Sequence, residues 1–234
     1  MLKLVVYPGA FQEPSASPFC VKAMCLLKMA DLAHEIEETN DPRKAPKRKL
    51  PVLVNGSAVI ADSDQIRDYL EETSGFDFDA GLNAEQRAVS RAVIRMLEEH
   101  LYFALVCDRW GNDANWAHTK RAYFSHIPFP MNGLVTRMVR KQALGAMDGQ
   151  GMGRHSDAER FERVRKDIDA VADLLGDKPF LFGEAPKAAD VTAVTMLGAG
   201  AAAPVPTDTS RYIAGHDTLS AYIERGRQAL YPQA

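Results

Sequence analysis

The segment Ser17-Pro18-Phe19-Cys20 combines residue types that can stabilise or carry a thiolate. It follows a loop and opens a run in which apolar residues between Val21 and Leu27 recur at helical intervals, with the proline suited to a first helical position. A helix start presents unpaired N–H groups and the positive end of the helix dipole, so it can hold an anion such as a thiolate. Ser17 is therefore a candidate donor to a sulfur anion, and a plain N-cap is its alternative interpretation.

The cysteines favour buried thiols over redox or metal chemistry. In a Cys-x-x-Cys motif the first cysteine is the exposed nucleophile and the second lies a turn inside the helix, but here Ser17 holds the first position. Cys20 is thus expected to be a core or resolving-position thiol. The three cysteines, Cys20, Cys25 and Cys107, match neither a disulfide framework nor a zinc site, and the six histidines are dispersed. A reducing compartment fits best, and no metal site is expected.

A second set of residues could bind a peptide-like ligand. Leu50-Pro51-Val52-Leu53 places a proline directly before an apolar strand, and Asp62-Ser63 follows at the next helix start. A cis proline in such a place exposes the backbone of the following residue to an extended ligand, and a helix start can hold a carboxylate. We predict a cis peptide at Pro51, although either motif alone is more typical of an ordinary loop proline or N-cap.

The surrounding pattern predicts the elements that position these residues. Apolar and alternating runs, with Asn55-Gly56 as a hairpin turn, predict strands over 2–6, 34–38, 52–54 and 58–61 and helices over 18–30 and 63–73. Beyond 77–83, which we take as the linker, the pattern is helical. Capping boxes at Asn83 and Ser156 open long amphipathic helices, and further helices are predicted over 188–197 and 219–230, separated by the Gly/Ala/Pro-rich segment 198–206. The expected fold is α/β over 1–76 followed by an all-α domain over 84–234.

In combination, these motifs resemble the glutathione S-transferase superfamily. SPFC at the first helix, KLPVL before the hairpin and ADSDQIRDYLEE after it resemble its glutathione-binding domain. PSASPFCVKAMCLLKMADLAHE is similar in particular to the failed-axon-connections and metaxin-like branch and its bacterial relatives. The resemblance touches both expected domains and is weakest from Trp110 to Ala143. It implies a thioredoxin-like domain followed by the helical domain of this superfamily.

The resemblance also implies roles for individual residues. Ser17 would face the glutathione sulfur, Pro51 would be the cis proline, and Val52 would pair through its backbone with the cysteinyl unit. The γ-glutamyl end would be held by Asp62 and Ser63. Lys49, or a cation near it in the basic run 43–49, would meet the glycyl carboxylate, although such a run is usually only a solvated loop.

Three positions depart from the family pattern or stay open. The helical-domain capping motif usually has Ser or Thr three residues before its Asp, but Lys187 precedes Asp190 here, so that cap must be weaker or replaced. Tyr7 ends the first strand, where several transferase classes keep a catalytic tyrosine, and it ranks behind Ser17. In the Gly-rich segment 149–155, a helix-breaking turn, Arg154 and His155 could face the interdomain cleft.

Composition narrows the function further. A net charge of −3 supplies no field for nucleic acid or an anionic membrane, and no apolar run approaches the roughly 20 residues of a membrane span. The N-terminus lacks the pattern of a signal peptide, so a cytoplasmic protein is expected. By resemblance we expect a homodimeric transferase that uses glutathione as co-substrate and attacks a small electrophile. The alternatives are a non-catalytic interaction module with the same fold and, disfavoured by the serine, a reductase working through Cys20.

Overall fold

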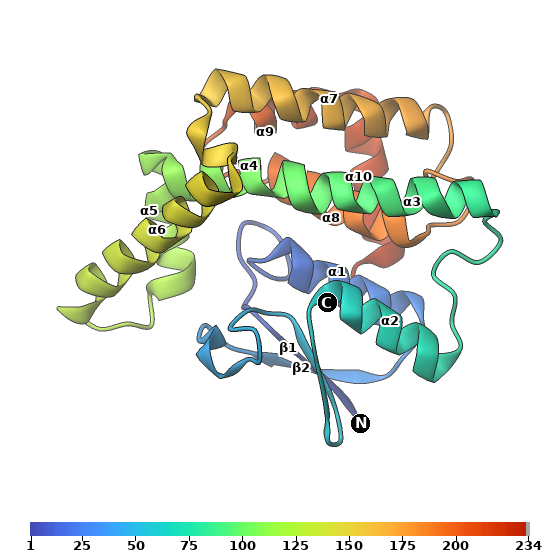
Figure 1. The fold of residues 1–234 in the computed structure, drawn as a ribbon, viewed down its shortest axis with the longest axis horizontal. Coiled ribbons are helices and arrows are strands. Elements are labelled where there is room, and N and C mark those ends of the chain that lie inside the picture. Colours follow the sequence, from blue (N-terminus) through green and yellow to red (C-terminus); the bar gives the residue numbers. More distant parts are fainter. Residues whose placement is uncertain (233–234) are drawn as a thin grey trace.

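The N-terminal part is a four-stranded sheet in the order β2-β1-β3-β4 (Figure 1). The computed structural model describes residues 1–232. The strands are β1 (Leu2–Val6), β2 (His34–Glu38), β3 (Val52–Asn55) and β4 (Ala58–Ala61). β1 runs parallel to β2 and antiparallel to β3, and β3 and β4 form the hairpin at Asn55-Gly56. The predicted strands and hairpin are confirmed.

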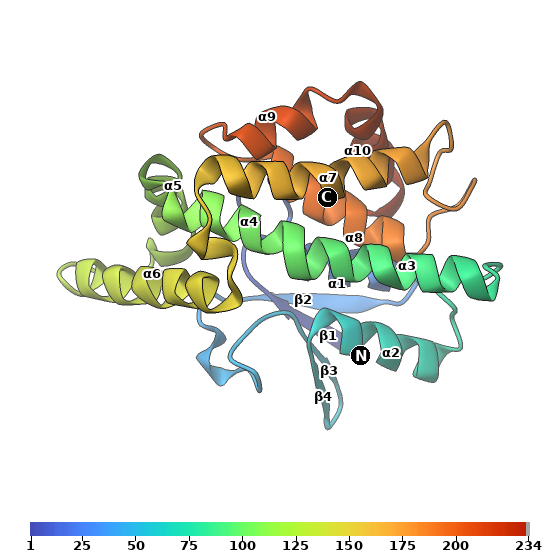
Figure 2. The ribbon, with the colours of Figure 1, turned by 45° about the horizontal axis from the view of Figure 1, so that its top comes forward.

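Two helices cover this sheet, α1 (Pro18–Met29) and α2 (Ser63–Ser74), with a short 3₁₀ turn η1 (Pro42–Lys44) between β2 and β3. α1 is buried along most of its length, from Cys20 to Leu27. A helix that is buried all round must be covered on both sides. Figures 1 and 2 show α1 between the sheet and the helical layers above it.

The rest of the chain is helical. Its elements are α3 (Ala84–Met96), η2 (Leu97–Leu101), α4 (Tyr102–Val106), η3 (Cys107–Gly111), α5 (Asp113–Phe124), α6 (Met131–Gln150), η4 (Met152–Arg154), α7 (Asp157–Leu175), α8 (Ala188–Ala201), α9 (Asp208–Ala214) and α10 (Asp217–Leu230). η2 and η3 are π-helical segments on either side of α4. α5 and α6 project from one end of the helical layers (Figures 1 and 2). The thioredoxin-like plus all-helical fold class is confirmed. Within residues 1–232, no helix has both the length and the apolar character that a bilayer crossing requires.

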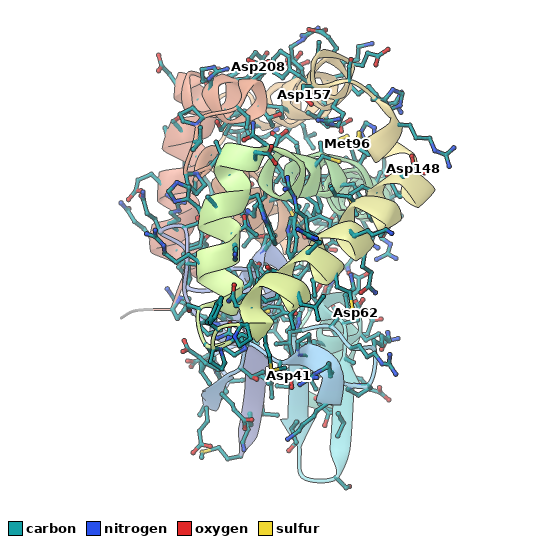
Figure 3. The ribbon with its side chains drawn as sticks, turned by 90° about the vertical axis from the view of Figure 1, so that its left-hand side faces the viewer. Asp41, Asp62, Met96, Asp148, Asp157 and Asp208 are labelled. Carbon is teal, nitrogen blue, oxygen red and sulfur yellow. The ribbon has the colours of Figure 1, made fainter. Side chains whose placement is uncertain are left out.

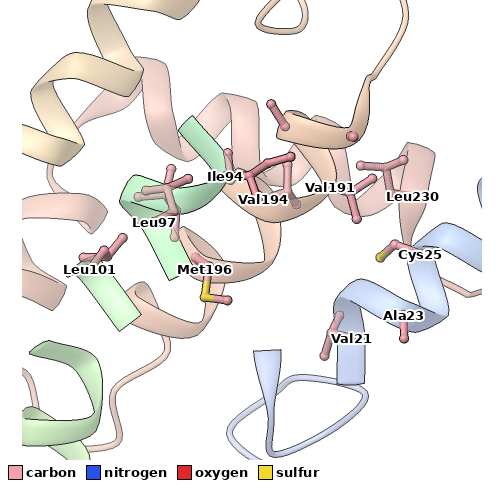
Figure 4. Close-up of a cluster of buried hydrophobic side chains, with 14 of the residues drawn as sticks. Val21, Ala23, Cys25, Ile94, Leu97, Leu101, Val191, Val194, Met196 and Leu230 are labelled. Carbon is pink, nitrogen blue, oxygen red and sulfur yellow. The ribbon is translucent and has the colours of Figure 1, made fainter. Parts of the chain in front are cut away.

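One continuous apolar core joins the two parts. α8 is buried from Ala188 to Gly200 and packs against α1, α3 and α10. Figure 4 shows Val21 of α1 and Val194 of α8 in this cluster, together with Leu97 of η2. A Cβ on Gly226 of α10 would come within 2.3 Å of the Val194 side chain, so only glycine permits this approach of α10 to α8. The two domains therefore share side-chain packing and are not simply joined end to end.

α8 is longer than predicted. It continues to Ala201, into the segment 198–206 that we expected to separate two helices. Gly200 lies against Ile213 and Leu105, where an added Cβ would meet Ile213 Cδ1 at 2.8 Å. The first small residues of this segment permit close helix packing, and the helix ends only after them.

At the start of α8, contacts of Asp190 and Lys187 replace the Ser or Thr cap that the sequence lacks. The Asp190 carboxylate accepts N–H bonds from Lys187 at 2.8 Å and Leu181 at 2.8 Å, and the Tyr222 hydroxyl donates to it at 2.8 Å. The Lys187 ammonium instead donates to the carbonyl of Ala80 at 2.7 Å. Asp190 thus does the capping from inside the helix, and the missing Ser or Thr is replaced by a contact to the segment between α2 and α3.

Candidate functional site

Ser17 lies at the start of α1, half-buried, with an extended backbone at φ −110°. Its carbonyl accepts the N–H groups of Cys20 at 3.0 Å and Val21 at 3.1 Å, which begins the helix. Its hydroxyl makes no side-chain capping bond to α1 among the described residues. An ordinary N-cap uses its hydroxyl on the second or third amide of the helix, so the structure disfavours that alternative. The hydroxyl is not used on the α1 amides and lies close enough to the Cys20 thiol to act on its pKa.

Cys20 is fully buried one turn into α1, as expected. Burial raises the pKa of its thiol to about 11, although the Tyr7 backbone and the hydroxyls of Ser15 and Ser17 act in the opposite direction. A thiol with this pKa is protonated at neutral pH, and the thiolate is the nucleophile. Burial also raises the pKa of Cys25. Neither cysteine of α1 is suited to attack a substrate.

The hairpin motif and the start of α2 meet where β3 begins and β4 ends. The Leu50-Pro51 peptide is cis, which confirms that prediction. Val52, directly after it, pairs with Ala61 of β4 and is buried. The amide of Asp62 lies 3.4 Å from the Pro51 carbonyl. Asp62 is therefore brought next to Pro51 and Val52 although ten residues separate it from Pro51 in the sequence, and Figure 3 shows Asp62 where the sheet domain meets the helices.

Asp62 adopts a backbone conformation that is uncommon for a residue with a side chain. Its φ of 97° lies outside the ordinary regions for non-glycine residues, and its carboxylate accepts the N–H of Asp64 at 2.9 Å. Such conformations persist only where neighbouring contacts hold them, and they concentrate at binding sites. Ser63, the first residue of α2, is 3% exposed. The start of α2 thus brings the uncommon Asp62 backbone and the buried Ser63 together, where the sequence predicted that a carboxylate binds.

A buried ion network lies beneath this helix start. The Lys22 ammonium, 1% exposed, bonds Asp64 Oδ1 at 3.1 Å and Glu98 Oε1 at 2.6 Å. Burial alone would raise the pKa of Asp64, but Lys22, Arg91 and Arg95 outweigh it and hold that pKa at about 2. Burial raises the pKa of Glu98 in spite of the same cations. The network links α1 and α2 to η2 of the helical domain, and sequence patterning did not identify it.

The remaining predicted residues lie apart from this set. Lys49 is exposed in the loop before β3. Arg154 pairs with Asp148 at 3.6 Å on the surface, and His155 lines an open groove beside α7. Among the described contacts none connects these three side chains to Ser17 or Ser63. The contact expected of Lys49 and the cleft position of Arg154 and His155 remain predictions.

Aromatic side chains from the helical domain face the start of α1. The Tyr7 ring lies edge-on to Tyr123 of α5 at 5.4 Å between centroids, and Phe19 lies edge-on to Tyr102 of α4 at 4.7 Å. Burial raises the pKa of Tyr7, Tyr102 and Tyr123, so all three phenols are protonated at neutral pH. Trp110 continues the wall, 5.7 Å from Tyr123. We call Tyr7, Phe19, Tyr102, Trp110 and Tyr123 the aromatic wall.

The helical-domain part of the wall was missed because Trp110 and Tyr123 lie in the segment where the resemblance is weakest, and Tyr102 lies shortly before it. Tyr102 follows η2, and Trp110 lies in η3. Each π-helical segment changes which residues share a helix face, so counting at the α-helical period through this region gives the wrong face. The local density of aromatic residues was the available signal, together with the Tyr7 that the sequence had already indicated.

Comparison with known protein families gives matches in both domains. Residues 18–116 match the glutathione S-transferase N-terminal domain, and residues 164–226 match the glutathione S-transferase C-terminal domain. Among solved structures, a glutathione transferase of Phanerochaete chrysosporium is 16% identical, covers 100% of this chain and 98% of its own, and superposes with a TM-score of 0.70. At that identity the likeness concerns the fold alone.

Three named relatives extend over most of this chain. Isoprene-epoxide–glutathione S-transferase of Rhodococcus is 32% identical over 97% of this chain and 98% of its own length. Failed axon connections of Drosophila melanogaster is 31% identical over 79% of this chain, which spans only 46% of that protein. Metaxin-1 of Mus musculus is 22% identical over 99% of this chain and 76% of its own length.

Proposed function

The chain belongs to the glutathione S-transferase superfamily, and from that premise we propose that it binds glutathione and transfers its thiolate to a small electrophile. The observation that carries this proposal is the half-buried hydroxyl of Ser17, which stands at the start of α1 without capping it. A donor in that position adds to the positive end of the helix and stabilises a sulfur anion.

Glutathione binds in this proposal along the edge where β3 and α2 meet. The backbone of Val52, directed by cis-Pro51, pairs with the cysteinyl unit. The start of α2, with Asp62 and Ser63, holds the γ-glutamyl end. Lys49 reaches the glycyl carboxylate from its exposed loop. The bound thiol then points toward Ser17, with the aromatic wall on its other side.

The name of the 32% identical relative makes small epoxides the first electrophiles to test. The thiolate attacks an epoxide carbon, the S–C bond forms as the C–O bond breaks, and the resulting alkoxide takes up a proton. Because burial keeps the phenols of Tyr7 and Tyr102 protonated, either can donate that hydrogen bond or proton. Tyr102 is our first choice, because its ring packs edge-on against Phe19, two residues after Ser17 in the chain.

Replacement of Ser17 tests the proposal. A hydroxyl donated to a charged sulfur contributes about 1.5 to 3 kcal/mol, so Ser17→Ala should lower the transfer rate about ten- to a hundredfold and leave glutathione affinity within about threefold. Cys20→Ser is the control and should change little. Full activity of Ser17→Ala on a substrate that the wild type converts would contradict the assignment and make Tyr7 the next candidate.

The second candidate function is a non-catalytic interaction module, which the similarity to failed axon connections and metaxin-1 favours. Both readings share the fold, and a fold does not determine function. Calorimetric titration with glutathione separates them. Saturable binding supports the transferase, whereas no heat of binding at millimolar ligand supports the module.

We further propose a cytoplasmic homodimer that pairs the first domain of one chain with the helical domain of its mate. Each domain exposes large apolar side chains: Ile36 and Val59 on the sheet, and Phe129, Leu134 and Met138 near and on α6. Light scattering at micromolar concentration should give twice the chain mass. Leu134→Glu, at a side chain that is 75% exposed, should shift the mass toward the monomer without lowering the melting temperature.

A further inference from the structure

The loop between Tyr7 and Ser17 folds back on itself and ends where it began. The Ala16 amide donates to the Pro8 carbonyl at 2.9 Å, and Ala10 and Glu13 exchange two backbone bonds of 3.1 and 3.0 Å. The two residues between them, Phe11 and Gln12, have φ values of 58° and 61°. Glycine and asparagine suit such a turn, whereas Phe and Gln do not. The turn therefore depends on contacts from outside the loop.

Helical-domain residues supply the first of these contacts at Ala16. Arg109 of η3 donates to the Ala16 carbonyl at 2.9 Å, and the Tyr123 hydroxyl of α5 donates to the same oxygen at 2.9 Å. The Arg109 guanidinium also lies over the Phe11 ring, 4.4 Å from its centroid. The Ala16 carbonyl belongs to the rigid peptide plane that ends in the Ser17 nitrogen. Two donors on that oxygen fix the orientation from which the Ser17 side chain starts.

The second contact is a buried carboxylate on the same loop. Glu13, 7% exposed, pairs with Arg227 of α10 and accepts the Tyr231 hydroxyl at 2.7 Å. Both partners come from the C-terminal end of the described chain, more than two hundred residues from Glu13. A buried carboxylate without partners is costly, so this pairing fixes the turn at Ala10–Glu13 against α10.

We infer that the helical domain sets the position of Ser17 through two clamps on its loop, Arg109 with Tyr123 at Ala16 and Arg227 with Tyr231 at Glu13. This inference rests on the proposed role of Ser17. These four side chains act as positioning residues, because their polar groups bond the loop at Ala16 and Glu13 and act on Ser17 through it. A displacement of Ser17 by a fraction of an ångström weakens a hydrogen bond that depends steeply on geometry. Thiol activation in the first domain is then under the control of the second.

Two conservative variants test the clamps separately: Tyr123→Phe removes one donor from Ala16, and Glu13→Gln removes the charge that Arg227 meets. Tyr212→Phe is the matched control, because its hydroxyl bonds Asp169 at 2.5 Å within the helical domain and touches no part of the loop. The first measurement is the ultraviolet absorbance of bound glutathione thiolate as a function of pH, without electrophile. The second is hydrogen–deuterium exchange over residues 7–20.

Both clamp variants should raise the apparent pKa of the bound thiol by about one unit, a tenfold fall in the ratio of thiolate to thiol, with glutathione affinity within about threefold. Their exchange over 7–20 should be at least about tenfold faster than in Tyr212→Phe. An unchanged thiol pKa overturns the inference, whatever the exchange shows. If the wild type binds no glutathione, the proposed function fails, and the clamps are then tested by exchange alone. Exchange in the clamp variants that equals that of Tyr212→Phe overturns the clamps, whereas faster exchange supports them.

Discussion

On the sheet side of the candidate site, Pro51, Val52 and Asp62 present main-chain groups, whereas on the helical side Tyr102 and Tyr123 present rings and hydroxyls. Main-chain geometry on the sheet side follows from short local patterns, such as a proline before a strand. The helical side depends on how a long helix with two π-helical segments is placed over the first domain. The sheet side can thus bind one constant peptide through its main-chain groups. The side chains of the helical side can vary without changing the sheet side.

The sheet side rests on the buried ion network, and its removal should have the largest effect. Lys22→Met leaves the buried Glu98 and the half-buried Asp64 without the ammonium that lies between them. Breaking one partner of a buried pair costs about 3 to 5 kcal/mol, so urea unfolding should show a loss of that size. Lys3→Met is the control: its pair with Glu37 is exposed, and its removal should not move the midpoint measurably. Equal midpoints for the two variants would contradict the structural role of the network.

The same network predicts an acid limit to stability. The pKa of Asp64 is held at about 2, below its ordinary value near 4, by Lys22 and Arg91 against the effect of burial. A depressed folded-state pKa stabilises the fold above the unfolded pKa, and this contribution is lost as pH falls through the folded value. Wild type should therefore lose stability relative to Asp64→Asn between about pH 4 and pH 2, measured by denaturant unfolding at fixed salt. If the difference in stability between the two proteins stayed constant over that pH range, the ion pairs of Asp64 would be excluded as the source of the acid sensitivity.

On the sheet side, removal of a single hydroxyl tests ligand binding alone. Ser63→Ala removes a buried hydroxyl from the start of α2, where the proposal places the γ-glutamyl group. A hydrogen bond to a charged group contributes about 1.5 to 3 kcal/mol, so the glutathione Kd should rise at least about tenfold in calorimetry. Ser74→Ala, at the other end of the same helix, removes a hydroxyl that donates to the Leu70 carbonyl and accepts the Phe76 amide, and it should bind glutathione like the wild type.

The two sides also differ in how far the sequence alone predicts them. The hairpin and the start of α2 follow from neighbouring residues, because Asn-Gly and Asp-Ser each constrain their own backbone, whereas the cis bond at Pro51 was predicted from the motifs in combination and the family that they resemble. Arg109 carries no comparable local signal. Its partners, Ala16 and Ala199, are about ninety residues away in the sequence, so its role exists only once the helices are packed.

Lys22 shows the same limit inside the well-predicted domain. Its spacing places it on α1, but in a helix buried all round no pattern distinguishes a buried lysine from an exposed one. Only the arrival of Asp64 from α2 and Glu98 from η2 makes the position tolerable for a charge. Helices, strands and turns can thus be predicted from neighbouring residues, whereas polar contacts between domains can be identified only in the folded structure.

The smallest expected effect tests the helical side and separates it from the sheet side. Tyr102→Phe removes a phenol that burial keeps protonated and leaves the ring against Phe19. If this hydroxyl donates to the oxygen that becomes charged when an epoxide opens, its loss costs one hydrogen bond of about 0.5 to 1.5 kcal/mol, a factor of about two to ten in kcat/KM. Glutathione Kd should stay as in the wild type, the reverse of the Ser63→Ala result.

The substrate dependence of the Tyr102→Phe effect decides its cause. A lost proton donor lowers the rate with an epoxide but not with an aryl halide, which releases halide and needs no proton at a developing alkoxide. A merely loosened wall lowers both rates together. Tyr212→Phe, on the far side of the helical domain, should change neither. A Tyr102→Phe variant that keeps wild-type kcat/KM for epoxides would leave the helical side with a shape but no chemical role, and Tyr7 would be the phenol to test next.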